Sequence, residues 1–386
     1  MQSYFSSNSK KIGILGGGQL GKMLTDVARK YDLYTKILDP TAEAPAAFSC
    51  KEFVQGNFNN FDTVMNFGAD CEVITIEIEG VNTEALQNLQ NMGKKVFPQP
   101  EVIALIQNKV HQKTFYDNHN LPTADWFPVQ NNKELLYKLK QYNFDLPFVW
   151  KAATGGYDGR GVFVVKSEDD LKSIPDVEGL IEKHMSISTE IAIVVAQNQR
   201  GEIVIFPPVE MAFHPIANQV EYVFCPANLS SQVINSASQI AARLARELSI
   251  VGLLAVELFV NDSGDILINE CAPRVHNSAH LSIESWATSQ FDQHLRAILD
   301  FPLGSVEMLR PAVMVNLTGE PGYSGPVFYH GAEKVMAMPE AFIHLYGKAE
   351  TRPHRKMGHV TLTAPSIKEA KEKAIMVKNT LKVISL

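Results

Sequence analysis

The residues with the clearest chemical potential are a lysine and the glycine-rich loop that follows it. The segment Lys151-Ala-Ala-Thr-Gly-Gly-Tyr-Asp-Gly-Arg-Gly161 places the lysine after an apolar stretch and then supplies four glycines. Such a loop can fold over phosphate groups and offer backbone N–H donors, while an ammonium group neutralises their charge. A flexible hairpin tip has a similar glycine content, but Tyr157, Asp158 and Arg160 add more reactive groups than a turn needs. The segment therefore favours a polyphosphate site.

Two glutamates give the second chemical signal, because Glu257 and Glu270 flank the turn-forming sequence NDSG. If Val260 pairs with Asp265 across this turn, Glu257 lies opposite Ile268. Glu270 is then a diagonal neighbour of Glu257 on the same face, at roughly 7–8 Å, whereas a slip of one residue would separate the faces. Glu257 also lies within the apolar run LLAVELFV, where a carboxylate needs a partner. The pair predicts a Mg²⁺ site that bridges to phosphates rather than a solvated hairpin face.

Two further segments supply charged and polar donors. Arg274, His276 and Asn277 follow Glu270 closely, and they belong either to the site or to a capping segment before the next helix. The stretch 346–359 is the densest basic segment of an acidic chain. It is either a phosphate site for a substrate or a solvated loop, and its basic residues are Lys348, Arg352, Arg355 and Lys356.

A glycine motif near the N-terminus permits a different interpretation. Gly16-Gly17-Gly18-Gln19-Leu20-Gly21 matches G-x-G-x-x-G between a strand and a helix, and Asp39 ends the next strand. This is close to the dinucleotide fingerprint, in which the acid binds a ribose. The same turn also binds other anions at a helix N-terminus, or only packs a helix on a strand. A nicotinamide oxidoreductase therefore stays open at this point.

Composition limits the class of protein. A chain of 386 residues predicts two or three domains, and a net charge of −7 gives no general attraction to nucleic acid or anionic membranes. The four cysteines show no C-x-x-C spacing, which argues against a zinc site or a disulfide framework and favours a reduced, cytoplasmic compartment. The first residues lack the apolar core of a signal peptide. The apolar run 251–260 is short and contains Glu257, so no membrane span is expected.

The expected elements alternate in the first hundred residues, which predicts a parallel sheet covered on both faces. The expected strands are 11–15, 34–38, 72–77 and 95–97, and the expected helices are 20–29, 60–67 and 83–92. Further on, the pattern predicts one helix over 101–118 and another over 281–299, with Ser236 as the N-cap of a third. Strands 148–151 and 162–165 flank the glycine loop. The last 80 residues are expected to form a small α/β unit.

Taken together and in this order, the motifs resemble the ATP-grasp superfamily and, within it, the 5-(carboxyamino)imidazole ribonucleotide synthase family. The resemblance covers nearly the whole chain and rests on GGGQLGKM, TIEIEGV, GGYDGRGV, ELFV, NECAPRVHNSAH and YGK…RPHRKMGHVT. It implies an α/β ATP-grasp fold in four parts. These are a Rossmann-like parallel-sheet domain (1–105), a small lid domain (106–185), a large domain (186–305) and a C-terminal α+β region (306–386).

The resemblance also implies an activity in purine biosynthesis. ATP, bicarbonate and aminoimidazole ribonucleotide would combine through carboxyphosphate to give the N-carboxylated ribonucleotide, ADP and phosphate. The enzyme would be a homodimer that needs Mg²⁺. Its first domain would bind no dinucleotide.

Roles for individual residues follow from the same resemblance. Glu257 and Glu270 would bind Mg²⁺, and Asp158, Arg274 and His276 would serve the chemistry, with Asp158 or His276 handling the amine proton. The residues expected at ATP are Lys109, Lys151, Gly156, Tyr157, Asp158, Gly159, Arg160, Gly161, Glu182, Lys183, His184, Met185, Glu190, His214, Asn269 and Glu270. The residues expected at the ribonucleotide are Gln19, Glu77, Tyr157, Asp158, Arg274, His276, Asn277, Lys348 and Arg355.

Three other functions remain to be weighed. Another ATP-grasp ligase, such as a formate-using glycinamide ribonucleotide transformylase, would share the same motifs. A nicotinamide oxidoreductase would leave the Lys151 loop and the glutamate pair unused. A nucleotide sensor without catalysis would be favoured by loss of the metal ligands, and both glutamates are present.

Overall fold

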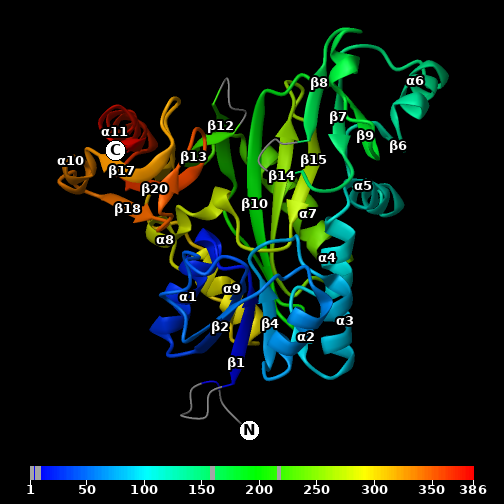
Figure 1. The fold of residues 1–386 in the computed structure, drawn as a ribbon. Coiled ribbons are helices and arrows are strands. Elements are labelled where there is room, and N and C mark those ends of the chain that lie inside the picture. The colour runs from blue at the N-terminus through cyan, green and yellow to red at the C-terminus, as the bar shows by residue number, and fades with distance from the viewer. Residues whose placement is uncertain (1–3, 5–9, 157–160, 215–218) are drawn as a thin grey trace.

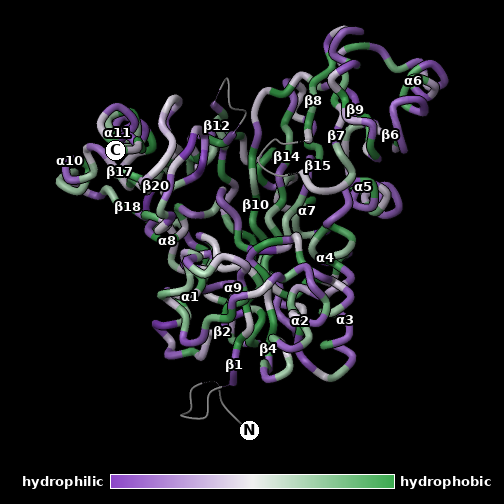
Figure 2. The backbone as a smooth tube through the Cα atoms, in the orientation of Figure 1, coloured by the Kyte–Doolittle hydropathy of each residue, from purple (hydrophilic) through white to green (hydrophobic). Residues whose placement is uncertain are grey.

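The chain is built around four β-sheets, and the computed structural model describes residues 4, 10–156, 161–214 and 219–386 (Figure 1). Hydrophobic segments gather along strands such as β4, β10 and β14, and the outer helix α6 is largely hydrophilic (Figure 2). In the described ranges, no helix combines the length and the apolar character needed to cross a membrane.

The N-terminal sheet is parallel throughout, as the alternation of strands and helices predicts. Its order is β3-β2-β1-β4-β5. Both faces are covered, so β1 and β4 are almost completely buried and their sequences are mainly apolar. The strands are β1 (Lys11–Leu15), β2 (Tyr34–Asp39), β3 (Glu52–Gln55), β4 (Val73–Ile76) and β5 (Lys95–Val96), and the helices are α1 (Gln19–Lys30), α2 (Phe61–Gly68) and α3 (Thr83–Asn91).

The single helix predicted over 101–118 is wrong, because two helices occupy this stretch. They are α4 (Pro100–Ile106) and α5 (Lys109–Asn118). The side chain of Asn108 accepts hydrogen bonds from the N–H groups of Val110 and His111 at 2.8 and 3.2 Å, and so acts as the N-cap of a new helix. As a result, Lys109 is the first residue of α5.

The lid is a four-stranded antiparallel sheet with the order β6-β9-β7-β8. The hairpin of β7 and β8 carries the glycine loop at its tip, as predicted. Phe148 and Trp150 of β7 point into the lid core and are fully buried. The elements of this unit are β6 (Trp126–Val129), α6 (Asn132–Gln141), β7 (Phe148–Ala152), β8 (Val162–Val165), η1 (Asp170–Ser173) and β9 (Gly179–Lys183).

The large sheet has nine strands and forms the centre of the molecule. Its order is β15-β14-β10-β12-β13-β16-β20-β18, with β11 paired to β10. Helix α7 (Ser231–Glu247) covers one face. Its N-cap is Ser230, whose side chain accepts from Val233 N–H, so the predicted cap at Ser236 is wrong. The strands before the C-terminal region are β10 (Thr189–Gln197), β11 (Ile203–Ile205), β12 (Val209–Phe213), β13 (Val220–Cys225), β14 (Gly252–Val260) and β15 (Ile266–Ala272).

The long helix predicted over 281–299 is also wrong. The stretch contains the short α8 (Ser282–Ser285) and then α9 (Gln290–Ile298), preceded by the 3-10 turn η2 (Asn277–Ala279). Trp286 between the two helices is extended and forms a β-bridge with Met308. Tertiary pairing thus overrides the helical pattern.

The C-terminal region is an α/β unit, but three of its strands continue the large sheet. These are β16 (Ala312–Thr318), β18 (Ala341–Leu345) and β20 (Lys356–Thr363), and β16 pairs directly with β13. The remaining strands form a small sheet of their own. The other elements are β17 (Gly325–His330), α10 (Ala332–Met336), β19 (Glu350–Thr351), α11 (Ile367–Thr380) and β21 (Lys382–Ser385).

Candidate active site

Glu257 and Glu270 face each other across β14 and β15, although not in the predicted register. The pairing of Val260 with Asp265 is wrong, because the strands are displaced by one residue. A β-bulge compensates for this displacement by inserting Asn269 as an unpaired extra residue. The two carboxylates are therefore direct neighbours on one face rather than diagonal ones.

Their surroundings give the two carboxyl groups different protonation. Burial raises the pKa of Glu257, and the charges of Glu270 and Glu190 raise it further. Burial acts in the same direction on Glu270, but Lys109 and Lys151 outweigh it and lower the pKa of that carboxyl. Lys109 also donates a hydrogen bond to Glu270 Oε2. The pair therefore holds one proton near neutral pH, as expected for two close carboxyl groups.

The donor set on this hairpin fits a magnesium ion that is shared with phosphates. Mg²⁺ prefers carboxylate oxygens and usually keeps several positions for water and phosphate. Burial and the charge of Glu270 favour the protonated form of Glu257. A bound cation would replace that proton and offset the repulsion between the two carboxylates. Over 10–156, 161–214 and 219–386, no group of three or more His, Cys, Asp and Glu side chains is arranged to hold a metal ion. Phosphate oxygens would have to complete the coordination.

A second charged network lies beside the pair. Lys151 Nζ donates to Asn269 Oδ1 at 2.8 Å and lies 2.6 Å from Glu182 Oε2. The other oxygen of Glu182 is paired with Lys113. Lys151, Glu182 and Lys113 are each less than 10% exposed. Sequence reasoning missed Lys113, although its position four residues after Lys109 on one helix places both lysines on the same face.

Glu190 completes this group of acidic side chains. Its strand β10 pairs Glu190 with Phe259 and Ala192 with Glu257, so the two glutamates share a face of the large sheet. Burial raises the pKa of Glu190 to about 7, and the charge of Glu270 adds to the effect. The site thus contains more carboxyl groups than its lysines neutralise, which suits cation-linked ligands.

A pocket of about 490 Å³ lies where the lid joins the large sheet. The predicted adenine segment contributes Lys183, His184 and Met185 to its wall, and Lys183 Nζ lies 3.6 Å from Asp125 Oδ2. The hairpin turn of the glutamate pair forms another wall, with Asp262 among its residues. The pocket is therefore adjacent to both the lid hinge and the carboxylate hairpin.

The glycine-rich loop leaves β7 and returns to β8. Gly155 and Gly161 have φ values of +76° and +75°, which glycine adopts without strain. The N–H of Ala152 donates to Gly161 O at 2.8 Å and closes the hairpin. Gly156 is partly exposed at the start of the tip. Four predicted residues lie outside the described part of the chain: Tyr157, Asp158, Gly159 and Arg160.

The segment after β15 brings its three predicted residues toward different partners. His276 Nε2 lies 3.6 Å from Glu257 Oε1. Arg274 Nη2 lies 2.7 Å from Glu79 Oε1, which fixes the guanidinium against the N-terminal domain. Asn277 exchanges two amide hydrogen bonds with Asn316, at 2.9 and 3.0 Å. Sequence reasoning missed Glu79, even though it lies in the TIEIEGV motif. It also missed Asn316, because the mainly apolar sequence of β16 gave no indication of a functional side chain.

The first domain has no vacant anion site at its glycine motif. The carboxylate of Glu77 accepts from Gly18 N–H at 3.0 Å and from Gly21 N–H at 3.2 Å, so it occupies the N-terminus of α1. A Cβ on Gly16 would lie 2.6 Å from the Glu77 side chain. Because a protein carboxylate fills the place that a pyrophosphate would take, the dinucleotide interpretation loses its structural basis. Gln19 is the first residue of α1 and directly follows Gly18, whose N–H donates to this carboxylate.

The basic C-terminal segment follows Leu345, whose carbonyl accepts a hydrogen bond from Lys22 Nζ of α1 at 2.9 Å. Lys348 Nζ donates to Lys356 O at 2.7 Å and lies 5.6 Å from the centre of the Tyr346 ring. Arg355 Nη1 donates to Glu350 O at 2.6 Å. The charge of Lys356 acts on the Glu257 carboxyl, opposing the rise in its pKa. Lys356 therefore acts electrostatically on the carboxylate pair, whereas the sequence placed it only among the basic residues of a possible substrate phosphate site.

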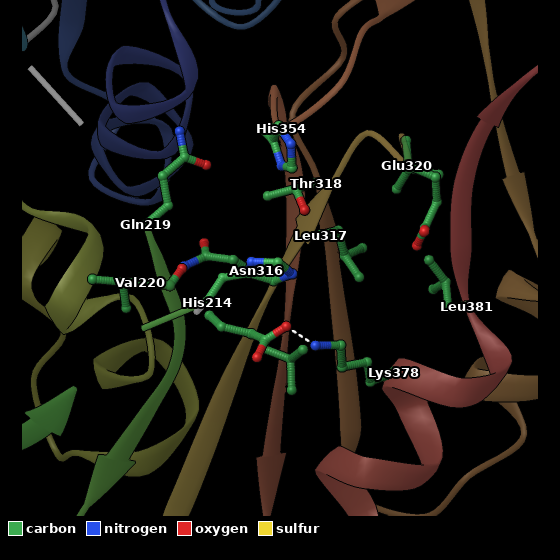
Figure 3. Close-up of a pocket in the computed structure, with 13 residues that line it drawn as sticks. His214, Gln219, Val220, Asn316, Leu317, Thr318, Glu320, His354, Lys378 and Leu381 are labelled. Carbon is green, nitrogen blue, oxygen red and sulfur yellow. Dashed lines mark hydrogen bonds and ion pairs between the residues drawn. The ribbon is translucent and has the colours of Figure 1, made fainter. Parts of the chain in front are cut away.

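His214 lies apart from the groups described so far. It lines a cavity of about 50 Å³ between β13, β16 and α11 (Figure 3). His354 stands across from it, with ring centroids 6.1 Å apart. Asn316 also lines this cavity and bonds to Asn277, so the cavity adjoins the predicted substrate segment. The predicted contact of His214 with ATP stays a prediction.

One connected set of side chains emerges from the predicted residues. Contacts or charges link the lid, α5, the large sheet and the segment after it at a single place. The members of this set are Lys109, Lys151, Glu182, Glu190, Glu257, Asn269, Glu270 and His276.

Three family models match successive parts of the chain. They are described as the ribonucleotide synthetase preATP-grasp domain (residues 9–107), the ATP-grasp domain (residues 114–291) and the phosphoribosylaminoimidazole carboxylase C-terminal domain (residues 312–373).

Curated relatives match almost the whole chain. The chain is 33% identical over 355 residues to the N5-carboxyaminoimidazole ribonucleotide synthase of Bacillus subtilis, which covers 91% of this chain and 90% of that protein. A phosphoribosylaminoimidazole carboxylase of Candida glabrata is 35% identical over 374 residues, and the match covers 94% of this chain but 65% of that protein. The chain thus spans about two thirds of this longer relative.

Solved structures are similar along almost the full length. The N5-carboxyaminoimidazole ribonucleotide synthetase of Thermotoga maritima is 40% identical, with a TM-score of 0.90 over 98% of this chain and 100% of that one. An Aspergillus clavatus synthase, solved with ADP and 5-aminoimidazole ribonucleotide, is 33% identical with a TM-score of 0.88, over 97% and 98%. These likenesses confirm the predicted α/β ATP-grasp fold.

Proposed function

The chain belongs to the N5-carboxyaminoimidazole ribonucleotide synthase family of ATP-grasp ligases, and from this membership we propose its reaction. The protein joins bicarbonate to the amine of 5-aminoimidazole ribonucleotide at the expense of ATP. The products are the N5-carboxyamino ribonucleotide, ADP and phosphate. This step serves purine biosynthesis.

The observation that carries the proposal is the opposed pair Glu257 and Glu270, flanked by Lys109 and Lys151. In the first step an oxygen of bicarbonate attacks the γ-phosphorus of ATP, ADP leaves, and carboxyphosphate forms. Negative charge spreads over the phosphoryl oxygens in that transition state, and Lys109 and Lys151 are the cations placed to stabilise it. Mg²⁺ held by the glutamate pair would neutralise further phosphate charge when it is bound.

In the second step the amine nitrogen bonds to the carboxyl carbon of carboxyphosphate, or to the CO₂ that it releases, and phosphate leaves. The amine loses one proton. His276 is a candidate acceptor because its Nε2 lies beside Glu257 while Ser278 Oγ lies 2.8 Å from its Nδ1. Asp158 is the other candidate. Carboxyphosphate is unstable in water, so closure of the glycine loop between β7 and β8 would protect it.

The decisive measurement is ADP formation with each substrate omitted in turn. We expect full turnover only when ATP, Mg²⁺, bicarbonate and 5-aminoimidazole ribonucleotide are all present, with ¹³C from bicarbonate appearing in the product. A rate of ADP release that depends on neither bicarbonate nor the ribonucleotide would refute the proposed reaction. His276→Asn and Asp158→Asn are compared in the same assay, and unchanged coupling of ADP release to the ribonucleotide in both variants would remove their proposed role.

Other functions are separated by the same assays. Formate with glycinamide ribonucleotide tests the formate-using ligase, and we expect no ADP from this combination. NADH fluorescence tests the oxidoreductase, and we expect no change on titration because Glu77 fills the helix N-terminus.

A cytoplasmic homodimer is also part of the proposal. The four cysteines are all free, which suits a reducing compartment. Light scattering coupled to size-exclusion chromatography should give twice the mass of 42.8 kDa, and a monomer at micromolar concentration would contradict the dimer.

A further inference from the structure

Glu182 has two cationic partners, and only one of them is positioned to meet a phosphate. Its carboxylate lies between Lys151 of β7 and Lys113 of α5. Burial opposes the charge of this carboxylate, but Lys151 and Lys113 more than compensate and lower its pKa. Glu182 is therefore an ionised carboxylate, although the residue is only 3% exposed.

Lys151 and Lys113 differ in what else they contact. Lys151 Nζ also bonds to Asn269, the bulge residue beside the carboxylate pair, so it stands at the edge of the proposed phosphate site. Lys113 Nζ instead donates to Thr123 Oγ1, and that hydroxyl donates to Ile268 O at 2.8 Å. Lys113 is 3% exposed and is held on the far side of Glu182.

This arrangement creates a requirement when a nucleotide binds. Lys151 has to turn its charge from Glu182 toward phosphate oxygens. A buried carboxylate that loses its last counter-ion is strongly destabilised. A second cation that stays in place removes that obstacle.

We propose that Lys113 is a positioning residue that holds the Glu182 carboxylate and thereby releases Lys151 for the phosphates of ATP. The inference rests on the proposed function. Lys113 touches no substrate in this scheme and acts only through Glu182. Its neighbour Thr123 fixes the ammonium at the hinge between lid and large sheet, so the counter-ion remains when the lid moves.

The test compares Lys113→Met, Lys113→Arg, Glu182→Gln and the double variant Lys113→Met/Glu182→Gln. In Lys113→Met we expect KM for ATP to rise at least ~10-fold, with a smaller change in kcat. Lys151 is then the only cation that can balance Glu182, so it stays paired with that carboxylate instead of binding phosphate. Lys113→Arg keeps the charge and should recover most of the affinity. The double variant is compared with Glu182→Gln, because Glu182 itself belongs to the site. Lys113→Met should change KM for ATP little in the Glu182→Gln background, because no buried carboxylate then needs a partner.

A matched control is Lys36→Met. Lys36 is 6% exposed and paired with Asp70 at 2.8 Å in the N-terminal sheet, away from the site. It should lower the thermal midpoint and leave KM for ATP unchanged. If Lys113→Met and Lys36→Met have the same KM for ATP, or if Lys113→Met raises KM for ATP by the same factor in the Glu182→Gln background as in the wild type, the inference is overturned.

Two outcomes keep the inference separate from the proposed function. Wild-type protein that binds no ATP or ADP by calorimetry refutes the function itself, whereas normal wild-type turnover with an unaffected Lys113→Met refutes only the role of Lys113. Should Lys113→Met fail to fold, Glu182→Gln and Lys113→Gln/Glu182→Gln decide the matter. Equal KM values for ATP support the inference, and a difference of ~10-fold or more contradicts it.

Discussion

At the scale of single residues, the site is governed by how few cations face its carboxylates. Glu257 and Glu270 are direct neighbours. Lys109 bonds directly to Glu270, whereas its charge on Glu257 is outweighed by burial and by the charges of Glu270 and Glu190. Burial and like charge leave Glu257 holding a proton near neutrality. A divalent cation is the natural replacement for this proton, because it brings charge that both carboxylates can share.

Glu257→Gln and Glu270→Gln should each lower kcat by at least ~100-fold, because each removes an anionic ligand while leaving the hairpin intact. Binding of Mn²⁺ in the presence of ADP, followed by electron paramagnetic resonance, should weaken in both variants. Control substitution of Glu350, an exposed residue of β19, should change neither measurement. Retention of Mn²⁺ binding in both site variants would exclude the pair as metal ligands.

At the scale of elements, two backbone details place the functional groups. The bulge at Asn269 brings the carboxylates onto one face, and the N-cap at Asn108 starts α5 at Lys109. Neither detail follows from periodicity. The hydrophobic pattern predicted the strands and the glutamate hairpin, but a one-residue bulge leaves the pattern of apolar residues almost unchanged, so the register was wrong.

Asn108→Ala should destabilise the protein by about 1 kcal/mol, the usual cost of losing a side-chain N-cap. Because α5 carries both Lys109 and Lys113, KM for ATP should rise with it. Asn108→Asp restores the acceptor and should recover both properties. Urea unfolding and initial rates check the two effects, and an unchanged KM in Asn108→Ala would show that the start of α5 is fixed by packing instead.

Glu77→Ala should cost about 1–3 kcal/mol, because it leaves the buried N–H groups of Gly18 and Gly21 without an acceptor. The same change should raise KM for the ribonucleotide if Glu77 faces that substrate, and KM for ATP should stay constant. Glu77→Gln keeps one acceptor oxygen and should be intermediate in stability. Full stability of Glu77→Ala in urea unfolding would mean that another group caps α1.

At the scale of the whole molecule, buried neutral histidines join the parts. His294 of α9 lies against Thr75 of β4, with Nε2 2.9 Å from the hydroxyl oxygen, and its Nδ1 is buried without a hydrogen-bond partner in the described chain. The rings of His280 and His359 stack, with their centroids 4.8 Å apart, where the C-terminal strands meet the segment after β15. Burial lowers the pKa of His294 to about 4, and burial also lowers the pKa of His280 and of His359 well below the usual value.

These shifts predict acid-labile folding. Because the folded-state pKa of His294 lies below its usual value of 6.5, the unfolded chain binds more protons between pH 6.5 and 4, and stability falls as pH decreases through that window. His294 alone would account for a loss of about 3 kcal/mol at the acid end. His294→Gln should flatten the slope of unfolding free energy against pH, whereas His330→Gln on the exposed β17 should not. Equal slopes for the two variants would assign the acid lability elsewhere.

The overall architecture was more predictable than the connections between its parts. Motif order predicted the ATP-grasp fold, and alternation predicted the parallel sheet of the first domain. The long-range pairings were not predictable: Arg274 with Glu79, Asn277 with Asn316, and Lys113 with Glu182. Each joins residues far apart in sequence, and no local pattern encodes such a partner.

The unbroken ladder from β15 to β18 has a mechanical consequence. The strands that carry the carboxylates and the strands that flank the basic C-terminal segment belong to one hydrogen-bonded sheet. The sheet therefore fixes the distance between these two parts of the site. Opening has to be borne by the two connections that tether the lid, residues 119–125 and 184–188. Each is bonded to the edge of the sheet, the first at Ile268 and the second where Ser188 N–H donates to Val260 O at 2.9 Å. Nucleotide can then enter and leave by movement of the lid, while the large sheet and the basic C-terminal segment keep their relative positions.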